Sequence, residues 1–164
     1  MKFVSIIMGS KSDYDVVINA AHELEKFGVK YELIISSAHR SPQRTAEYVK
    51  EAEAKGAQVF IAAAGMAAHL AGAIAANTTR PVIGIPMSGG ALNGVDALYS
   101  TVQMPAGMPV ATLAIGKAGA INSAYLAMQI LALSDSELAQ KLKADRTAKA
   151  QGVASDSASV EVIL

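Results

Sequence analysis

The segment FVSIIMGSKSD (3–13) sets the fold class of this chain. Its first six residues are apolar apart from Ser5, which is typical of a strand that is covered on both faces. The next five form a polar turn. Apolar residues then recur at helical spacing from Val16 to Phe27, and Gly28 follows as an expected C-cap. A buried strand that leads through a short turn into an amphipathic helix indicates an α/β protein with a parallel sheet.

The rest of the chain repeats this alternation. Further strands are predicted at Tyr31–Ile35, Gln58–Ala64, Pro81–Ile85 and Val110–Ile115. One helix is predicted from the N-cap pair Ser41-Pro42 to Gly56, and a second opens at the turn 65–70 and runs to Asn77. Further helices are predicted at Ala97–Val102, at Ala118–Leu133 and, capped by residues 134–137, at Leu138–Ala150. Five alternations of strand and helix imply right-handed crossovers and a parallel sheet with helices on both faces.

We expect this alternation to form one domain over residues 1–150. Residues 151–159 are small and polar and are predicted to be loosely structured. Residues 160–164 are apolar again, so a C-terminal tail over 151–164 is expected to dock on a neighbouring subunit. We find no internal repeat and no linker that would divide the chain further.

Composition excludes several classes of protein. The 164 residues carry 14 basic and 14 acidic side chains, and a formal net charge of zero lacks the positive footprint of a nucleic-acid-binding protein or a polybasic membrane anchor. Hydrophobic residues make up 52% and charged residues only 17%, which is inconsistent with disorder over most of the length. A chain with so few charges often hides surface in an oligomer, and we expect one here.

The absence of cysteine excludes disulfides, thiolate-bound zinc, iron–sulfur clusters and a cysteine nucleophile. One apolar stretch, residues 59–76, is long enough to suggest a membrane span. Gly65, His69 and Gly72 break it, so a buried strand that runs into a buried helix is favoured. The first residues are predicted to be a strand and not a signal peptide. A soluble cytoplasmic protein is therefore expected.

Polar side chains gather in the turns that follow the predicted strands. Because ligands bind outside the carboxyl ends of parallel strands, these turns are expected to meet in one crevice. They contain Ser10, Ser12, Asp13, Ser37, His39, Arg40, His69, Ser88 and Asn93.

The turn at 9–13 lies between a strand and a helix N-terminus, where free backbone N–H groups and hydroxyls can hold a phosphate. Asp13 can accept hydrogen bonds from ribose hydroxyls. The turn matches neither the P-loop nor the dinucleotide-binding pattern. A plain N-cap formed by Ser and Asp is the alternative interpretation.

Two histidines follow the second and third strands. His39 stands beside Arg40, so an imidazole can transfer protons next to an anion that the guanidinium holds. The small residues of the Gly65–Leu70 turn allow a ligand to approach the backbone near His69. An exposed loop with an incidental His39, and a buried, hydrogen-bonded His69, are the alternatives. His22 is expected to be an ordinary helix residue, and two loop histidines with one aspartate are too few ligands to predict a zinc site.

Five short motifs, taken together, resemble one family. GSKSD (9–13), SAHRSP (37–42), AAHL (67–70), PVIGIP (81–86) and YSTVQMP (99–105) occur in the order found in the N5-carboxyaminoimidazole ribonucleotide mutases of purine biosynthesis. The resemblance covers roughly residues 3 to 145. It implies a flavodoxin-like three-layer sandwich with a central parallel five-stranded sheet. It also implies a homo-octamer that moves a carboxylate from an exocyclic nitrogen to carbon 4 of an aminoimidazole ribonucleotide, without metal, ATP or biotin.

The resemblance assigns roles to individual positions. His39 matches the general acid/base of the family. Ser10, Asp13 and Arg40 match substrate-binding residues, and Ser12 and Ser37 line the same nucleotide site. His69 matches a second histidine in the loop, whose Gly65, Ala67 and Leu70 are also expected to line the substrate. The reaction releases carbon dioxide and recaptures it, so the resemblance further implies a closed pocket.

Two departures from the family pattern lie in this loop. Many members have Gly-Gly-Ala-Ala-His-Leu-Pro-Gly where this chain has Met66 and Ala71 in place of the second glycine and the proline. Met66 adds bulk at or near the pocket wall, which bears on the pocket's shape.

Two alternative functions stay open on the sequence. The first is a related aminoimidazole ribonucleotide carboxylase that uses carbon dioxide directly, and the AAHL motif favours the mutase over it. The second is a non-catalytic flavodoxin-like binding module. The chain lacks the acidic cluster of a receiver domain, and no aromatic residue falls in the site turns as a flavin carrier would need.

Overall fold

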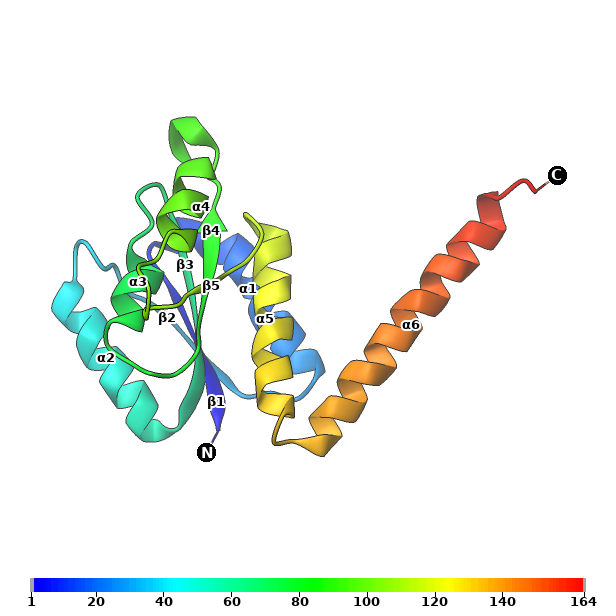
Figure 1. Cartoon of the computed structure of the whole chain (residues 1–164), viewed down its shortest axis with the longest axis horizontal. Coiled ribbons are helices and arrows are strands. Elements are labelled where there is room, and N and C mark those ends of the chain that lie inside the picture. The colour runs from blue at the N-terminus through cyan, green and yellow to red at the C-terminus, as the bar shows by residue number, and fades with distance from the viewer. Residues whose placement is uncertain (1, 164) are drawn as a thin grey trace. The chain divides into compact units, whose positions relative to one another are not determined.

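A computed structural model describes residues 2–163 of the chain. Five strands form one sheet in the order β2-β1-β3-β4-β5, and every neighbouring pair is parallel (Figure 1). The strands are β1 (Phe3–Met8), β2 (Tyr31–Ile35), β3 (Ala57–Gly65), β4 (Val82–Met87) and β5 (Ala111–Thr112). The helices are α1 (Tyr14–Lys26), α2 (Pro42–Lys55), α3 (Leu70–Ala75), α4 (Val95–Val102), α5 (Lys117–Ala132) and α6 (Ser136–Val160), with short 3₁₀ turns η1 (Lys11–Asp13) and η2 (Gly90–Leu92). The predicted α/β fold class is confirmed.

Both faces of the sheet are covered, as the apolar β1 segment predicted. All six residues of β1 are buried. On one face, α2 and α3 enclose a core that includes Phe60, Leu70 and Ile74. On the other face, α1 and α5 lie side by side (Figure 1), and the rings of Phe27 and Tyr125 meet edge to face at 5.8 Å between centroids. Burial of apolar side chains on both faces is what holds a parallel sheet together.

A polar contact crosses from the sheet to α2. The Ser5 hydroxyl on β1 lies 3.0 Å from the Tyr48 hydroxyl, and Tyr48 donates to Glu32 Oε2 of β2 at 3.0 Å. This chain of hydrogen bonds satisfies the one polar side chain of β1, which is fully buried. Burial of Tyr48 and its hydrogen bond to the carboxylate raise the pKa of the phenol to about 12, although the bond to Ser5 opposes the shift.

The stretch at 59–76 divides as expected into a buried strand and a buried helix, β3 and α3. Within the described part of the chain, no helix is long and apolar enough to cross a membrane.

The fifth strand is shorter than the predicted Val110–Ile115. Only Ala111 and Thr112 pair regularly with β4, although Leu113 N–H and Gly116 N–H still donate to carbonyls of β4 residues at 3.1 and 2.9 Å. The start of α5 packs against the end of this segment so closely that a Cβ on Gly119 would stand 1.7 Å from the Ala114 carbonyl oxygen. The chain at 113–116 thus meets α5 as well as β4, a long-range contact that the apolar pattern of 110–115 does not contain.

The prediction was also wrong about the end of the last helix. It ended that helix at Ala150 and left 151–159 loose, whereas α6 continues to Val160. The predicted cap is present, because Asp135 accepts a hydrogen bond from Leu138 N–H at 3.0 Å. Adding residues to an existing helix costs much less than starting one, so weak helix formers such as Ser155 extend it.

The chain groups into two units by internal contacts, one ending at Met128 and the other beginning at Gln129. The second unit consists of the end of α5 and the long, mostly exposed α6. A catalytic domain over 1–150 and a subunit-docking tail over 151–164 both remain predictions.

The Tyr48 hydrogen bonds generate a prediction about alkaline pH. An unfolded tyrosine ionises near pH 10, whereas folded Tyr48 keeps its proton to about 12, so its contribution to stability is present below pH 10 and is lost between these values. Tyr48→Phe should lower the free energy of unfolding by about 1 kcal/mol at pH 7. The variant should also lose less stability than the wild type between pH 10 and 12. Urea unfolding across this range measures both effects. Parallel pH profiles for the two proteins would contradict the assignment.

Candidate active site

The carboxyl ends of the strands bring the predicted turns together. Gly9 N–H, just after β1, donates to the Ala63 carbonyl of β3 at 3.0 Å, and Ser36 N–H, just after β2, donates to the Met8 carbonyl at 3.0 Å. These bonds hold the first three turns side by side. The rings of His39 and His69 consequently lie 5.2 Å apart between centroids at an angle of 52°. Thirty residues separate them in the chain, and their meeting confirms the expected convergence of these two turns.

The first turn divides its polar groups between structure and solvent. Ser10 is the N-cap of η1, and its hydroxyl accepts from Ser12 N–H at 3.3 Å and from the Ser12 hydroxyl at 3.0 Å. Asp13 precedes α1, but its side chain makes no capping hydrogen bond. The plain N-cap interpretation therefore holds for Ser10 and is wrong for Asp13.

The Asp13 carboxylate sits in a partly buried position. Burial raises its pKa above the ordinary value of 3.8, and a hydrogen bond with the Ser10 backbone opposes the shift only in part. Burial disfavours the charged form of this carboxylate, and the carboxylate does not cap its helix. It is therefore available to accept hydrogen bonds from hydroxyl groups of a ligand.

The second turn folds on itself and places Arg40 across the first. Ser37 Oγ accepts from Arg40 N–H at 3.1 Å, and an Arg40 Nη2 hydrogen bond of 3.4 Å reaches the Gly9 carbonyl. The Ser41 hydroxyl bonds the Ser37 backbone at 3.0 and 3.1 Å and does not cap α2, contrary to the prediction. Arg40 is exposed, so its remaining guanidinium donors can reach an anion above the Gly9 turn.

The third turn begins at Gly65, the last residue of β3. A Cβ on Gly65 would stand 3.4 Å from the Met87 carbonyl oxygen of β4, so the two strands end close together. Met66 follows with φ at 56°, in the left-handed region that costs a side-chain-bearing residue about 1 kcal/mol. Ala67 and His69 are exposed, and His69 is the N-cap residue of α3 without a capping bond. The alternative of a buried, satisfied His69 is therefore wrong.

The side chain of Leu70 is turned away from this surface. Only 2% of Leu70 is exposed, and it belongs to the core between α3 and the sheet. The first residue of α3 thus turns its side chain inward while the preceding histidine stays outside, and the contact of Leu70 with substrate stays a prediction.

The loop after β4 supplies a contact that no sequence pattern indicated. Ser88 and Asn93 are exposed there, as a site loop requires. The side chain of Met66 lies along Gly90, since a Cβ on Gly90 would stand 3.6 Å from Met66 Cγ and 3.8 Å from Met66 Cε. The sequence identified Met66 only as added bulk, and nothing in it pointed to Gly90 as its neighbour.

Over residues 2–163, no group of three or more His, Asp or Glu side chains is placed to hold a metal ion. His22 is exposed on α1, as expected for an ordinary helix residue.

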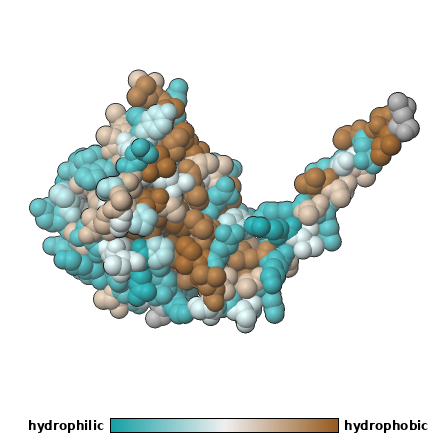
Figure 2. Space-filling view, in the orientation of Figure 1, coloured by the Kyte–Doolittle hydropathy of each residue, from teal (hydrophilic) through white to brown (hydrophobic). Residues whose placement is uncertain are grey.

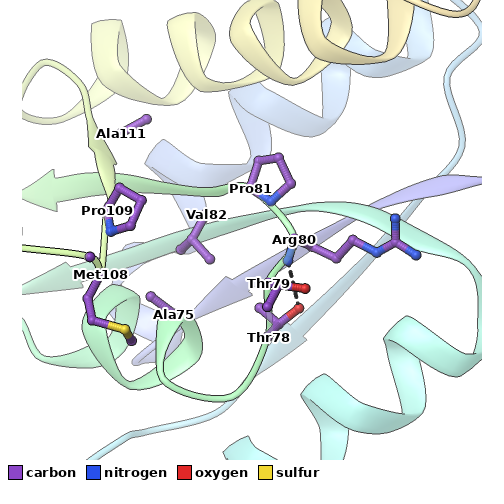
Figure 3. Close-up of a pocket in the computed structure, with 10 residues that line it drawn as sticks. Ala75, Thr78, Thr79, Arg80, Pro81, Val82, Met108, Pro109 and Ala111 are labelled. Carbon is purple, nitrogen blue, oxygen red and sulfur yellow. Dashed lines mark hydrogen bonds between the residues drawn. The ribbon is translucent and has the colours of Figure 1, made fainter.

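A separate pocket of about 470 Å³ opens at the opposite end of β4. Figure 3 shows Thr78–Val82 on one side and Met108, Pro109 and Ala111 on the other. Arg80 points away from the two prolines in this view, and its Nε lies 3.5 Å from Glu53 Oε1. None of the predicted site residues lines this pocket, so it is distinct from the convergence of turns.

Comparison with known proteins gives matches along nearly the whole chain. The model of a family described as AIR carboxylase matches residues 3–152. The N5-carboxyaminoimidazole ribonucleotide mutase of Escherichia coli K12 is 53% identical over 150 residues, which cover 92% of this chain and 89% of that protein. The protein of the same name from Bacillus subtilis is 51% identical over 154 residues, 94% of this chain and 95% of that protein.

A solved structure gives the same result in three dimensions. The crystal structure of Treponema denticola PurE superposes with a TM-score of 0.89 at 30% sequence identity, over 99% of this chain and 100% of that chain. Sheet order, covered faces and the polar turns at the carboxyl edge define a flavodoxin-like α/β enzyme fold. Within that class, the chain belongs to the AIR carboxylase family.

Asp13 generates a prediction that separates binding from stability. Because its folded pKa is raised, this group favours folding most below pH 3.8, and stability falls as the pH rises through the folded value. Asp13→Asn should therefore unfold at a higher temperature than the wild type at pH 7, and the difference should shrink as the pH is lowered toward 3.8. The variant should bind a ribonucleotide ligand about tenfold more weakly, because it loses charge-assisted hydrogen bonds.

Thermal unfolding and ligand titration at the two pH values test this prediction. An Asn variant that unfolds below the wild type at pH 7 would mean that favourable contacts hold the carboxylate.

Proposed function

We propose that the chain is a mutase that converts N5-carboxyaminoimidazole ribonucleotide to 4-carboxy-5-aminoimidazole ribonucleotide in purine biosynthesis. The observation that carries the proposal is the meeting of His39 and His69, 5.2 Å apart, next to the turn that Arg40 bridges to Gly9. Family membership and the names of relatives about 50% identical to the chain support the same substrate.

The reaction needs one acid and one base step, and a single imidazole can perform both. His39 as imidazolium donates a proton to the exocyclic carbamate nitrogen. The C–N bond breaks with its electron pair left on that nitrogen, and the carboxylate becomes carbon dioxide. Carbon 4 of the ring then attacks carbon dioxide with its π electrons, which leaves a carboxylate and a positively charged iminium. Neutral His39 removes the proton from carbon 4, so the ring regains aromaticity and the imidazolium is restored.

The neighbouring turns are proposed to hold the nucleotide in register for this exchange. Arg40 and the N–H groups of the first turn bind the phosphate, helped by the hydroxyls of Ser10, Ser12 and Ser37. Asp13 accepts from the ribose hydroxyls. The edge formed by half-buried Gly65 and exposed Ala67 and His69 is proposed to lie along the base, where backbone without bulky side chains permits close approach. No metal or organic cofactor enters these steps.

The second candidate is a carboxylase that adds carbon dioxide directly to aminoimidazole ribonucleotide. The description of the matching family, AIR carboxylase, favours it. Curated relatives at 49–55% identity bear the mutase name, and AAHL stands at 67–70, so the mutase is preferred. The two reactions differ in substrate, and one assay separates them.

We propose further that the enzyme acts in the cytoplasm as a homo-octamer. His39, Arg40 and His69 are exposed in the single chain, yet the reaction requires that carbon dioxide be retained, so a neighbouring copy would complete the enclosure. Hydrophobic residues also gather on the surface over α4 (Figure 2). Leu92, Val95, Tyr99 and Val102 are between 45% and 63% exposed, and the last three share helical spacing on α4, which suits a subunit contact.

The function is tested with two substrates. Wild-type enzyme should convert N5-carboxyaminoimidazole ribonucleotide rapidly and should use aminoimidazole ribonucleotide with modest bicarbonate poorly. His39→Asn should lose at least about a hundredfold in kcat, because the proton donor is gone. His22→Asn, which changes an exposed histidine on α1, should keep wild-type rates. Efficient use of the second substrate would establish the carboxylase, and no turnover of either would reject the enzyme.

Assembly is tested at α4. Tyr99→Glu places a charge in the exposed apolar surface and should reduce the particle mass measured by light scattering at least about twofold, with the far-ultraviolet circular dichroism unchanged. Lys50→Glu, on the exposed side of α2, should leave the mass unchanged. Equal masses for Tyr99→Glu and wild type would reject α4 as a subunit contact.

A further inference from the structure

Within residues 2–163, no side chain or backbone group hydrogen-bonds the imidazole of His39, and the ring of His69 is its neighbour. A base in proton transfer has to be held in a narrow range of positions, usually by a hydrogen bond from a third group. The position of His39 therefore depends on the backbone of its turn, residues 36–41, and on what holds that backbone.

Hydrogen bonds close this turn on itself. Ser41 N–H donates to the Ser37 carbonyl at 2.8 Å, and the Ser41 hydroxyl donates to the same carbonyl at 3.0 Å. Ser37 Oγ accepts from Arg40 N–H at 3.1 Å. These bonds give the turn its shape, but both partners of each bond lie within the turn, so they do not fix it on the rest of the protein.

A buried pair of hydroxyls joins the turn to α2. Ser36 and Thr45 are each 2% exposed, and their hydroxyl oxygens lie 2.8 Å apart. The Thr45 hydroxyl donates its one proton to the Ser41 carbonyl at 3.2 Å, so the Ser36 hydroxyl donates to Thr45 Oγ1. These bonds start at the first residue of the turn, pass through α2 and end at the last residue of the turn. Because they are shielded from water, removing one partner leaves a buried polar group unsatisfied.

We infer that Ser36 and Thr45 are positioning residues that hold the turn of His39 where its imidazole can exchange protons with the substrate. The inference rests on the proposed mutase function. Both hydroxyls are buried, so they act through the backbone of residues 36–41 and not by contact with the nucleotide. Asp13 and the N–H groups that hold the phosphate lie on a different turn, so substrate binding should depend on the pair less than proton transfer does.

The first test removes one hydroxyl. Thr45→Val puts a methyl group of similar size in its place and leaves the Ser36 hydroxyl buried without its acceptor. With N5-carboxyaminoimidazole ribonucleotide, kcat should fall at least about tenfold, because small displacements of a catalytic group slow the reaction strongly, while KM stays within about threefold. Thr45→Ser keeps the hydroxyl and should retain wild-type kcat within about threefold. Rates are measured below the unfolding temperature of each variant.

Thr101→Val is the matched control for lost stability. Thr101 is 3% exposed, and its hydroxyl donates to the carbonyl of Ala97, four residues earlier, at 2.7 Å. Thr45 bonds the Ser41 carbonyl with the same spacing. Because Thr101 lies in α4, outside the turn and α2, its replacement should lower the unfolding temperature about as much as Thr45→Val does and should keep wild-type kcat.

A double variant separates an unsatisfied hydroxyl from a misplaced turn. Ser36→Ala combined with Thr45→Val leaves no buried donor of the pair without an acceptor, so it should unfold at a higher temperature than Thr45→Val alone. Its kcat should stay low, because the side-chain bond to the Ser41 carbonyl is still missing.

A further measurement needs no substrate. The chain has three histidines, so protein labelled with ¹³C-histidine gives three ring signals in the NMR spectrum, which single replacements by asparagine assign. Thr45→Val should move the His39 signal and leave that of His22 unchanged, and Thr101→Val should leave both unchanged.

Wild-type kcat in Thr45→Val or in the double variant would overturn the inference, and so would an equal loss of kcat in Thr101→Val. An unmoved His39 signal in Thr45→Val would also overturn it. If the wild-type enzyme converts no substrate, the proposed function is rejected, and the histidine signals still decide whether the pair holds the turn.

Discussion

The parallel pairing of β1 with both β2 and β3 is the constraint on which the rest of this structure depends. β1 is buried on both faces and hydrogen-bonded to a strand along each edge. Its register therefore sets where β2 and β3 end along the strand direction. Met8 aligns with Ile35 on one side and with Ala63 on the other. Three polar turns consequently leave the sheet at the same level. The core and the site are thus two results of one hydrogen-bond register.

The turns that leave this edge are held by backbone and hydroxyl contacts, and their ionisable groups stay available. Ser37 and Ser41 bond within their own turn, whereas His39 and His69 stay at the surface. Asp13 keeps a carboxylate that burial disfavours, and Met66 keeps a backbone conformation that glycine would adopt more easily. Both positions lower stability at the place where chemistry is proposed, which is a common property of active sites.

The single chain displays its site openly, and this bears on how the reaction would be enclosed. Small residues in the third turn leave the backbone accessible, but accessibility alone does not retain a gas. Met66 packs on Gly90 of the loop after β4, and the exposed apolar residues of α4 suit the proposed contact between subunits.

The sequence by itself determined the fold class, the order of the elements and the turns that carry chemistry. Periodicity and composition are local properties, and the short apolar runs of β1, β3 and β4 between turn residues indicate buried strands. The five motifs also sufficed to identify the family. Local patterns were weaker where long-range contacts decide the outcome, as at the shortened β5, where Gly119 of α5 meets Ala114.

Only the tertiary structure decided which side chains face the site. Leu70 and His69 are adjacent in sequence, yet Leu70 enters the core and His69 stays exposed. The orientation of α3 about its own axis, set by its packing on β3, decides which of the two is buried. Asp13 resembled a helix cap until its geometry was known. Met66 and Gly90 lie 24 residues apart in loops that meet in the folded chain, and sequence periodicity does not predict this contact. These facts depend on distances between segments, which folding sets and sequence patterns do not contain.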